Sequence, residues 1–258
     1  MPPLPDLRVV SLGSIRRHEE IDPLRVDRLV DRIAEDGIQV NPMVCVEGSD
    51  DVLVLLDGAT RTESLRKMGL EHAVVQVVDP DTVTLETWHH VVRGCRPDEL
   101  LSTIGAHPEL SLSEEPGNPA VHLSTGSDHL VTGTGLSPNA TLSALVSGYV
   151  GRWTITRAVD PTVEVVAGTF PDWAAVVEFP TLTVDGVMKA AIGDDLLPAG
   201  ITRFLVPERA LRLNVPLSLL ETDTPAEEKQ VALDVLLEHR ATEGRIRRYE
   251  ETVFILDD

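Results

Sequence analysis

The sequence has few cysteines, few aromatic residues and no long hydrophobic run. Cys45 and Cys95 are its two cysteines, and neither lies in a CxxC or Cys/His spacing typical of a metal site. Reduced thiols of this kind favour a cytoplasmic protein. Aromatic residues make up 3% of the chain, so aliphatic side chains must fill the core. No apolar run approaches the ~20 residues that span a bilayer, and the first residues do not resemble a signal peptide.

Basic residues are also scarce. The chain contains 22 Lys and Arg against 42 Asp and Glu, which gives a formal net charge of −20 over 258 residues. Nucleic-acid binding depends on clustered Lys and Arg that displace counterions from the phosphate backbone. We therefore expect no nucleic-acid partner and no membrane partner. A local basic patch stays open, but no stretch of the sequence shows one.

The first 79 residues predict a compact mixed α/β unit. Asp22-Pro23 is a typical N-cap and first helical position, and apolar residues at helical spacing then run to Gly37. The other expected elements are an opening strand near 9–12, a hairpin of 42–46 with 52–56, a short helix after 58, and a strand at 74–78.

The rest of the chain predicts an α+β arrangement. Residues 81–93 suggest a helix, and the Gly-, Pro-, Ser- and Glu-rich residues 105–120 suggest a linker or long loop. We therefore predict two domains, 1–95 and 96–258. Expected later strands are 121–123, 129–132, 163–168, 174–178, 203–206, 211–215 and 252–256, with helices at 139–150, 184–192 and 224–242. The last helix begins with a capping box, Thr224 to Glu227.

The junction Asp57-Gly58-Ala59-Thr60-Arg61 joins a predicted strand to a predicted helix. A helix N-terminus presents unpaired N–H groups and partial positive charge to an anion. Gly58 permits close backbone approach, Thr60 offers a hydroxyl, and Arg61 can contact phosphate with two nitrogens. Asp57 would suit Mg²⁺ or a sugar hydroxyl. The pattern predicts a phosphate site, and an ordinary Asp-Gly turn is the alternative.

Other segments place polar side chains together. His18 and Glu19 lie in a charged loop, where a carboxylate can orient a hydroxyl and accept its proton. The loop that contains Thr202 and Arg203 pairs a hydroxyl with a guanidinium, which suits a carboxylate or a phosphate. For His18 and Glu19 the alternative is a solvated charged loop, and for Thr202 and Arg203 it is an edge strand with an exposed arginine.

The Trp88-His89-His90 segment is a further candidate. Neighbouring histidines on a helix point about 100° apart, so they form a poor metal pair. One histidine could instead contact a substrate. The alternative is that Trp88 packs and the histidines are solvated.

Taken together, these segments resemble the free L-serine kinases that carry a ParB/sulfiredoxin-like N-terminal domain. The resemblance rests on four stretches that occur in the family's order, and it extends over almost the whole chain. They are IRRHEEIDPLRVDRLVDRI, LLDGATRTESLRKMGLEHAVVQVVD, TWHH and LPAGITRFLVPERALRLNVPLSLL. The resemblance implies an α/β (α+β) fold with a ParB/sulfiredoxin-like N-terminal domain.

The resemblance also implies an activity and its cofactors. It implies transfer of a phosphoryl group from ATP or ADP, with Mg²⁺, to free L-serine. The product would be O-phospho-L-serine for a siderophore or 2,3-diaminopropionate type of pathway. The choice of nucleotide, and of serine over a close hydroxy amino acid, stays open.

Site residues follow from the resemblance by position. It implies a catalytic pair, His18 and Glu19, with Glu19 as the catalytic carboxylate. The nucleotide motif falls on Asp57–Arg61, with Asp57 also at the metal. The substrate residues would be Trp88, His90, Thr202 and Arg203. The chain departs from the family at Thr60, which stands where the family has a histidine and cannot carry a positive charge.

Three other protein classes fit less well. A sulfiredoxin needs a cysteine in the nucleotide loop, where this chain has Ala59 and Thr60. A ParB-type partition protein needs a helix-turn-helix and a basic surface, and neither is evident. A nucleotide-binding regulator without catalytic activity remains the third alternative, because of Thr60.

Overall fold

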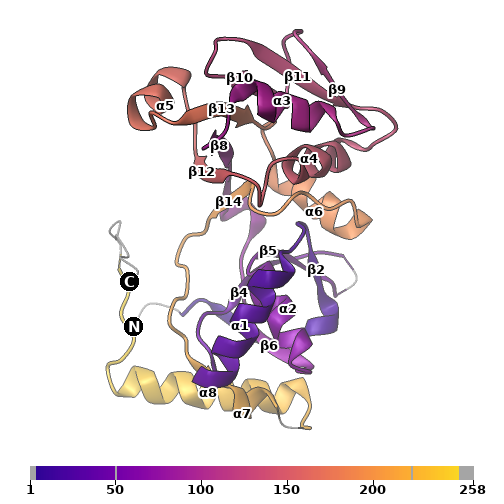
Figure 1. Cartoon of the computed structure of the whole chain (residues 1–258). Coiled ribbons are helices and arrows are strands. Elements are labelled where there is room, and N and C mark those ends of the chain that lie inside the picture. Colours follow the sequence, from indigo (N-terminus) through magenta and orange to yellow (C-terminus); the bar gives the residue numbers. More distant parts are fainter. Residues whose placement is uncertain (1–3, 50, 222, 250–258) are drawn as a thin grey trace.

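The computed structural model describes residues 4–49, 51–221 and 223–249, and it places them in two lobes, one around each of two sheets (Figure 1). Helices and strands are mixed in both, so the predicted α/β (α+β) class is confirmed. Among the described residues, no helix is both long and apolar enough to cross a membrane.

The first lobe contains a five-stranded sheet in the order β1-β6-β4-β5-β2. β1 pairs antiparallel with β6, β4 pairs antiparallel with β5, and the β4–β6 and β2–β5 pairs are parallel. The β4–β5 hairpin was predicted. The elements are β1 (Asp6–Ser11), a 3-10 turn (Leu12–Ser14), β2 (Ile15–Arg17), α1 (Pro23–Asp36), β3 (Ile38–Gln39), β4 (Met43–Glu47), β5 (Leu53–Asp57), α2 (Ala59–Lys67) and β6 (His72–Val77).

Helix α1 begins and ends where the sequence predicts. The Asp22 side chain accepts a hydrogen bond from the Leu24 N–H, and Pro23 occupies the first turn. Gly37 ends the helix in the left-handed conformation, with φ 64°. The helix buries Val26 and Ile33 and leaves its charged face exposed beside α2.

The second lobe contains a six-stranded sheet in the order β12-β8-β13-β10-β11-β9. Its pairings are all antiparallel. The elements are a 3-10 turn (Pro80–Thr82), β7 (Thr84–Thr87), β8 (His89–Arg93), α3 (Pro97–Gly105), β9 (Leu110–Ser113), β10 (Ala120–Leu123), β11 (Asp128–Gly133), α4 (Pro138–Ser147), β12 (Thr154–Ala158), α5 (Val163–Thr169), β13 (Trp173–Glu178) and α6 (Val184–Gly193). β7 is outside this sheet and pairs with β14.

The last part of the chain returns to the first lobe. β14 (Thr202–Leu205) pairs with β7, and β15 (Val215–Pro216) pairs with β3. The short α7 (Leu217–Leu220) precedes α8 (Ala226–Thr242), which packs along β1. Figure 1 shows α8 at the end of the first lobe that is remote from the second lobe. There the Gln230 side chain accepts from the Val9 N–H and donates to the Leu7 carbonyl. β8, which precedes residue 95, thus belongs to the second sheet, whereas α8, which follows it, packs on the first. Each lobe therefore contains elements from both sides of the predicted boundary.

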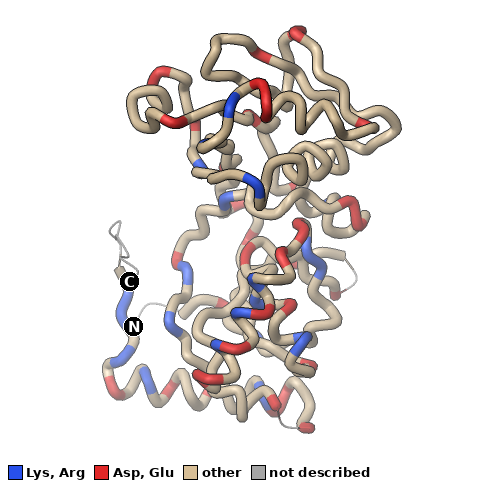
Figure 2. The backbone as a smooth tube through the Cα atoms, in the orientation of Figure 1, with Lys and Arg blue, Asp and Glu red and all other residues tan. Residues whose placement is uncertain are grey.

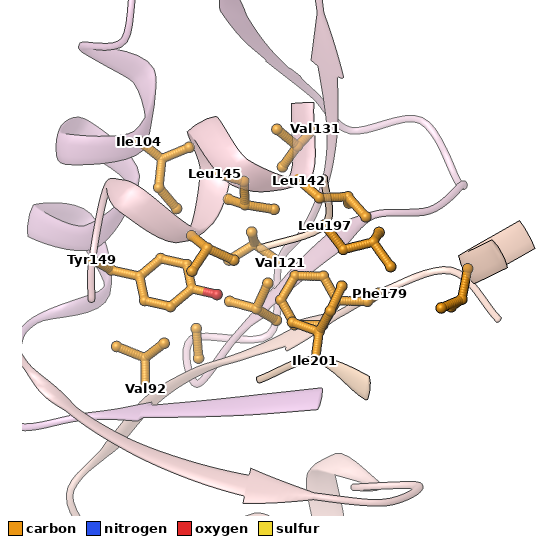
Figure 3. Packing of buried hydrophobic residues seen from close by; sticks show 14 of the residues in the cluster. Val92, Ile104, Val121, Val131, Leu142, Leu145, Tyr149, Phe179, Leu197 and Ile201 are labelled. Carbon is orange, nitrogen blue, oxygen red and sulfur yellow. The ribbon is translucent and has the colours of Figure 1, made fainter. Parts of the chain in front are cut away.

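One hydrophobic core is shared by the two lobes. Val44, Val46 and Val54 of the first sheet belong to the same buried cluster as Tyr149 and Phe179 of the second lobe. Figure 3 shows Tyr149 and Phe179 within this cluster. The alternate residues of the same strands, such as Cys45, point into a second cluster with α1, α7 and α8. The first sheet is therefore covered on both faces, and its β5–α2 end lies next to the second lobe.

Two element predictions were wrong in type. Residues 81–93 form β7 and β8 instead of a helix, because β8 lies between β12 and β13 and buries Val91 and Val92 on opposite faces. Residues 163–168 form α5 instead of a strand. The Thr162 hydroxyl caps that helix at the Val165 N–H, and the cap outweighs the β-branched composition.

Other predictions were wrong in place. Residues 105–120 are no linker, since they contain β9, an edge strand of the second sheet. Helix α8 begins at Ala226 with Pro225 at its N-cap, so Thr224 is not the cap. β15 covers only the end of the strand expected at 211–215. The strand expected at 252–256 lies outside the described residues.

Candidate functional site

A cleft of about 590 Å³ opens between the two lobes. It is lined by α1, by the start of α2, by Trp88 after β7, by Arg157 of β12 and by the segment from Ala199 to Arg209. Most of the predicted site residues meet here, although they come from distant parts of the sequence. They are Glu19, Asp57, Gly58, Ala59, Thr60, Arg61, Trp88, Thr202 and Arg203.

The N-terminus of α2 faces this cleft without a side-chain cap. Gly58 occupies the N-cap position with φ 107°, a conformation that residues with a Cβ rarely adopt. A Cβ at this position would also lie 2.8 Å from Cγ of Met43. The first N–H groups of α2 are therefore open to an anion in the cleft, with Thr60 in the first turn.

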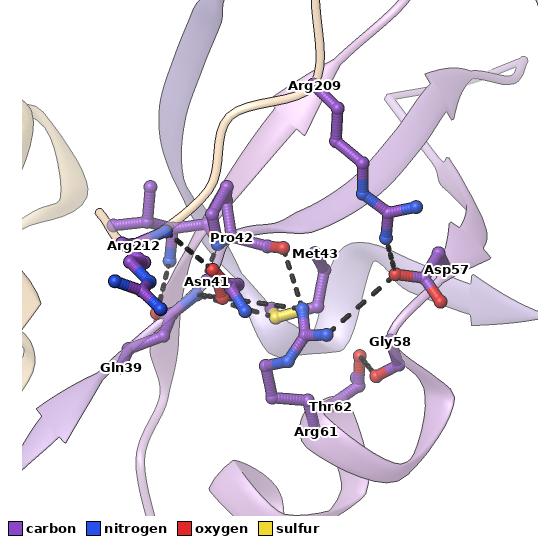
Figure 4. A network of polar contacts seen from close by, with 11 residues as sticks. Gln39, Asn41, Pro42, Met43, Asp57, Gly58, Arg61, Thr62, Arg209 and Arg212 are labelled. Carbon is purple, nitrogen blue, oxygen red and sulfur yellow. Dashed lines mark hydrogen bonds and ion pairs between the residues drawn. The ribbon is translucent and has the colours of Figure 1, made fainter. Parts of the chain in front are cut away.

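Arg61 is anchored on one side and faces an acid on the other (Figure 4). Its Nη1 donates to the Pro42 carbonyl at 2.7 Å, and its Nη2 lies 3.8 Å from Oδ2 of Asp57. Burial lowers the pKa of Arg61, and the neighbouring Asp57 opposes that shift. Arg209 also pairs with Asp57, so the carboxylate lies between two guanidinium groups.

Glu19 is held in place by the loop before β14. The Gly200 N–H donates to its Oε2 at 2.9 Å, and the Leu197 N–H donates to the His18 carbonyl at 2.8 Å. The Glu20 N–H then donates to the Leu197 carbonyl, so the two segments pair like parallel strands. Glu19 is half-buried and Glu20 is exposed. This arrangement fixes one carboxylate oxygen of Glu19 and leaves the other for a ligand.

His18 lies beneath the cleft and does not line it. It is 1% exposed, its Nδ1 lies 2.7 Å from the Leu55 carbonyl, and its Nε2 lies 3.1 Å from the Thr202 hydroxyl. A carbonyl can only accept, so Nδ1 carries the proton and Nε2 accepts from Thr202. Burial lowers the pKa of His18, which keeps the ring neutral. The Thr202 oxygen consequently presents lone pairs to the cleft.

Arg203 and Trp88 form one wall of the cleft. The guanidinium carbon of Arg203 lies 4.7 Å from the centre of the Trp88 ring, and its Nη1 lies 3.0 Å from Oε2 of Glu86. Stacking and the ion pair together hold the planar group in one orientation.

No protein-family model matches this chain. Over 256 residues it is 24% identical to the ATP-dependent L-serine kinase SbnI of Staphylococcus aureus (strain NCTC 8325 / PS 47), and the alignment covers 97% of both proteins. Among solved structures, SbnI with a C-terminal truncation matches with a TM-score of 0.76 and 22% identity, over 91% of this chain and 97% of that one. A free serine kinase in complex with AMP matches with a TM-score of 0.74 and 17% identity, over 84% and 95%.

The chain has the free serine kinase fold. The four sequence stretches predicted a similarity over almost the whole chain. That prediction is confirmed, because the similarity covers both lobes. Within this fold, Glu19 and the start of α2 face one cleft.

One predicted substrate residue is not in the cleft. His90 is 2% exposed within β8, and its Nδ1 lies 2.9 Å from the Tyr149 hydroxyl. Its ring also packs edge-on against Phe179. Burial lowers the pKa of His90 to about 4.

Sequence reasoning missed the basic character of the cleft. Seven arginines and four acidic residues line it, a formal charge of 7 − 4 = +3 within a chain of −20. Acidic positions are spread over both lobes and conceal this in the net charge (Figure 2). One signal was available, since Arg25, Arg28 and Arg32 follow the i, i+3, i+7 spacing that places them on one face of α1.

The described residues contain no group of three or more His, Cys, Asp or Glu side chains that could hold a metal ion. Mg²⁺ is typically bound through one or two carboxylates together with substrate phosphates. Asp57 before α2 fits that mode through Oδ1, since Oδ2 pairs with Arg61 and Arg209 and the side chain is 40% exposed at the edge of the cleft.

Proposed function

We propose that this protein is a kinase that transfers the terminal phosphoryl group of ATP to the hydroxyl of free L-serine. The observation that carries the proposal is the single cleft in which the open N-terminus of α2 faces Glu19 and the Thr202–Arg203 pair. An anion site, a carboxylate and an amino-acid site are the parts that phosphoryl transfer to an alcohol requires. The similarity to an ATP-dependent L-serine kinase supports the choice of both substrates.

The nucleotide phosphates would lie on the turn from Asp57 to Arg61. The N–H groups of α2 and the Thr60 hydroxyl supply donors, and Arg61 supplies positive charge. Thr60 is a neutral donor at the position where the family has a histidine that can carry positive charge. The arginines of the cleft would supply the positive charge that Thr60 lacks. Asp57 would hold Mg²⁺ together with the phosphates, and the ion would supply neutralisation of developing negative charge.

The free amino acid would lie against Trp88, Thr202 and Arg203. Arg203 matches a planar carboxylate in a two-nitrogen contact, and its stacking on Trp88 orients the group for it. Since the Thr202 hydroxyl donates its hydrogen bond to His18 Nε2, the Thr202 oxygen is an acceptor that suits an ammonium group. His18 is therefore a positioning residue in this proposal.

Glu19 would act as the general base. The serine hydroxyl attacks the terminal phosphorus, the new O–P bond forms, and the bond to the bridging oxygen of the β-phosphate breaks. The hydroxyl proton passes to Glu19, and ADP leaves. The Gly200 N–H fixes one Glu19 oxygen, so the other is directed to the substrate without a large loss of side-chain freedom.

We also propose a cytoplasmic location and a supply of O-phospho-L-serine to a biosynthetic pathway of the siderophore type. Both described cysteines are free thiols, which supports a reducing compartment.

The decisive test is turnover. The protein is incubated with Mg-ATP or Mg-ADP and a panel of free amino acids, and phospho-amino acids are detected by mass spectrometry. We expect O-phosphoserine with ATP, and none with the Glu19→Gln variant. Nucleotide binding without any phospho-amino acid would instead identify a regulator without catalytic activity.

A further inference from the structure

Arg157 lies in the cleft and is not part of the predicted site. It belongs to β12 of the second lobe, opposite α1 of the first. Its guanidinium packs against the backbone of Gly200, where a Cβ would fall 2.6 Å from Cζ of Arg157. Gly200 has φ 80° and also donates its N–H to Glu19. One glycine thus places the Arg157 charge beside the carboxylate.

Arg157 has no carboxylate partner within ion-pair distance in the part of the chain that the structure describes. Three other arginines of the cleft do have such partners, because Arg61 and Arg209 pair with Asp57 and Arg203 pairs with Glu86. Partial burial lowers the pKa of Arg157, the charge of Arg25 lowers it further, and Glu19 opposes both.

Arg25 faces Arg157 from the first turn of α1. Glu19 offsets only part of the repulsion between these two like charges, which costs free energy that a bound anion would recover. The N-terminus of α1 adds partial positive charge at the same place. The two guanidinium groups and the helix end thus form an anion site next to Glu19.

The geometry points to the ligand of this site. We infer that Arg157 and Arg25 clamp the phosphoryl group while it passes from the nucleotide to the serine hydroxyl, and that Arg157 is a further catalytic residue. This inference rests on the proposed function. The start of α2 would hold the phosphates that stay with the nucleotide, and the transferred group must lie closer to the base, Glu19. Charge that spreads over its oxygens in the transition state would be stabilised from both lobes at once.

The test uses Arg157→Met and Arg157→Lys, with Arg152→Met as the matched control. Arg152 is an exposed arginine shortly before β12 and lies outside the cleft. Arginines that neutralise a transferred phosphoryl group are worth ~10³-fold or more in turnover. We expect kcat to fall at least 10²-fold in Arg157→Met and less in Arg157→Lys, which keeps the charge. Arg152→Met should match the wild type.

Binding separates this inference from the proposed function. By calorimetry, Arg157→Met should bind AMP within about twofold of the wild type, while ATP and O-phosphoserine bind at least 10-fold more weakly. Equal losses for AMP and ATP would overturn the clamp, and so would a kcat within threefold of the wild type. A wild-type protein that makes no phosphoserine would refute the proposed function, and the ATP and AMP affinities would still test the clamp.

Discussion

The Nε2 atom of His18 lies 3.1 Å from the hydroxyl of Thr202, a residue 184 positions later in the chain. The bond joins the first lobe to the loop that would hold the amino acid. Because His18 Nδ1 donates to the Leu55 carbonyl, Nε2 carries no proton and accepts the hydrogen bond from the Thr202 hydroxyl. Protonation of His18 would remove the acceptor for Thr202 and place a charge in the core.

Acid should therefore destabilise the protein in a defined window. The folded-state pKa values of His18 and His90 lie below the unfolded value of about 6.5, so the unfolded chain binds more protons below that pH. The contribution of the two neutral histidines to the free energy of unfolding should be fully present above pH 6.5. It should decline as the pH falls toward about 4, the pKa of His90. His90 alone should contribute about 3 kcal/mol to this loss. Urea unfolding at pH 7.5, 6.5, 5.5, 4.5 and 3.5 measures the fall in the free energy of unfolding across this window.

Histidine variants check the origin of that decline. His90→Gln should make the profile between pH 6.5 and 5.5 less steep and leave the share of His18, whereas His239→Gln, at an exposed position on α8, should leave the profile unchanged. A profile that stays steep in His90→Gln would assign the loss to other groups.

Glu19→Gln should lower kcat by ~10²-fold or more while nucleotide affinity is retained, because the amide cannot accept the serine proton. Its remaining oxygen can still accept from the Gly200 N–H, so the loop should keep its shape. Steady-state kinetics and calorimetry measure the two quantities. Glu20→Gln is the control, since Glu20 is an exposed neighbour, and it should cost much less. Near-normal turnover in both variants would show that Glu19 is not the general base.

Arg61→Ala should weaken nucleotide binding by ~1.5–3 kcal/mol, the scale of a lost charged hydrogen bond. Calorimetry with ATP and AMP gives the value, and a thermal melt checks that the loss of the bond to Pro42 does not unfold the protein. An unchanged nucleotide affinity would show that the phosphates do not bind at the start of α2. Thr60→His introduces the histidine that the sequence resemblance implies at this position, and the variant should retain activity.

Arg203→Lys should raise the KM for serine more than the KM for ATP. Lysine keeps the charge and loses the planar two-nitrogen contact, and it stacks less well on Trp88. Initial rates with each substrate varied in turn provide the comparison. Equal effects on both KM values would indicate a structural role through the Glu86 ion pair.

Local signals predicted the first lobe well. The Asp22-Pro23 start of α1, the β4–β5 hairpin and the glycine turn before α2 all depend on nearby residues, and each was found where it was expected. β8 was missed because its type depends on the strands on either side of it, which come much later in the chain. Local periodicity does not report such long-range pairing.

The site was predictable only in part for the same reason. Glu19, the Asp57–Arg61 turn and Arg203 stood out by motif and resemblance, and all of them line the cleft. His18 and His90 were predicted from the same motifs and resemblance, but the folded chain buries both side chains outside the cleft lining. Arg157 gave no signal, because its proposed role depends on Gly200 and Arg25, which approach it only in the folded chain.

The packing of α8 against β1 affects the order in which the protein can be completed during synthesis. Leu213, Val215, Leu217, Leu220 and Leu233 fill the same core as Val9 and Val74. Gln230 bonds to the backbone of Val9, 221 residues earlier. On the ribosome, the first lobe therefore has an open, apolar side until the last helix emerges. The first lobe cannot complete its core before the second lobe has been made, so the α2 end of the cleft should reach its final arrangement only after α8 has been synthesised.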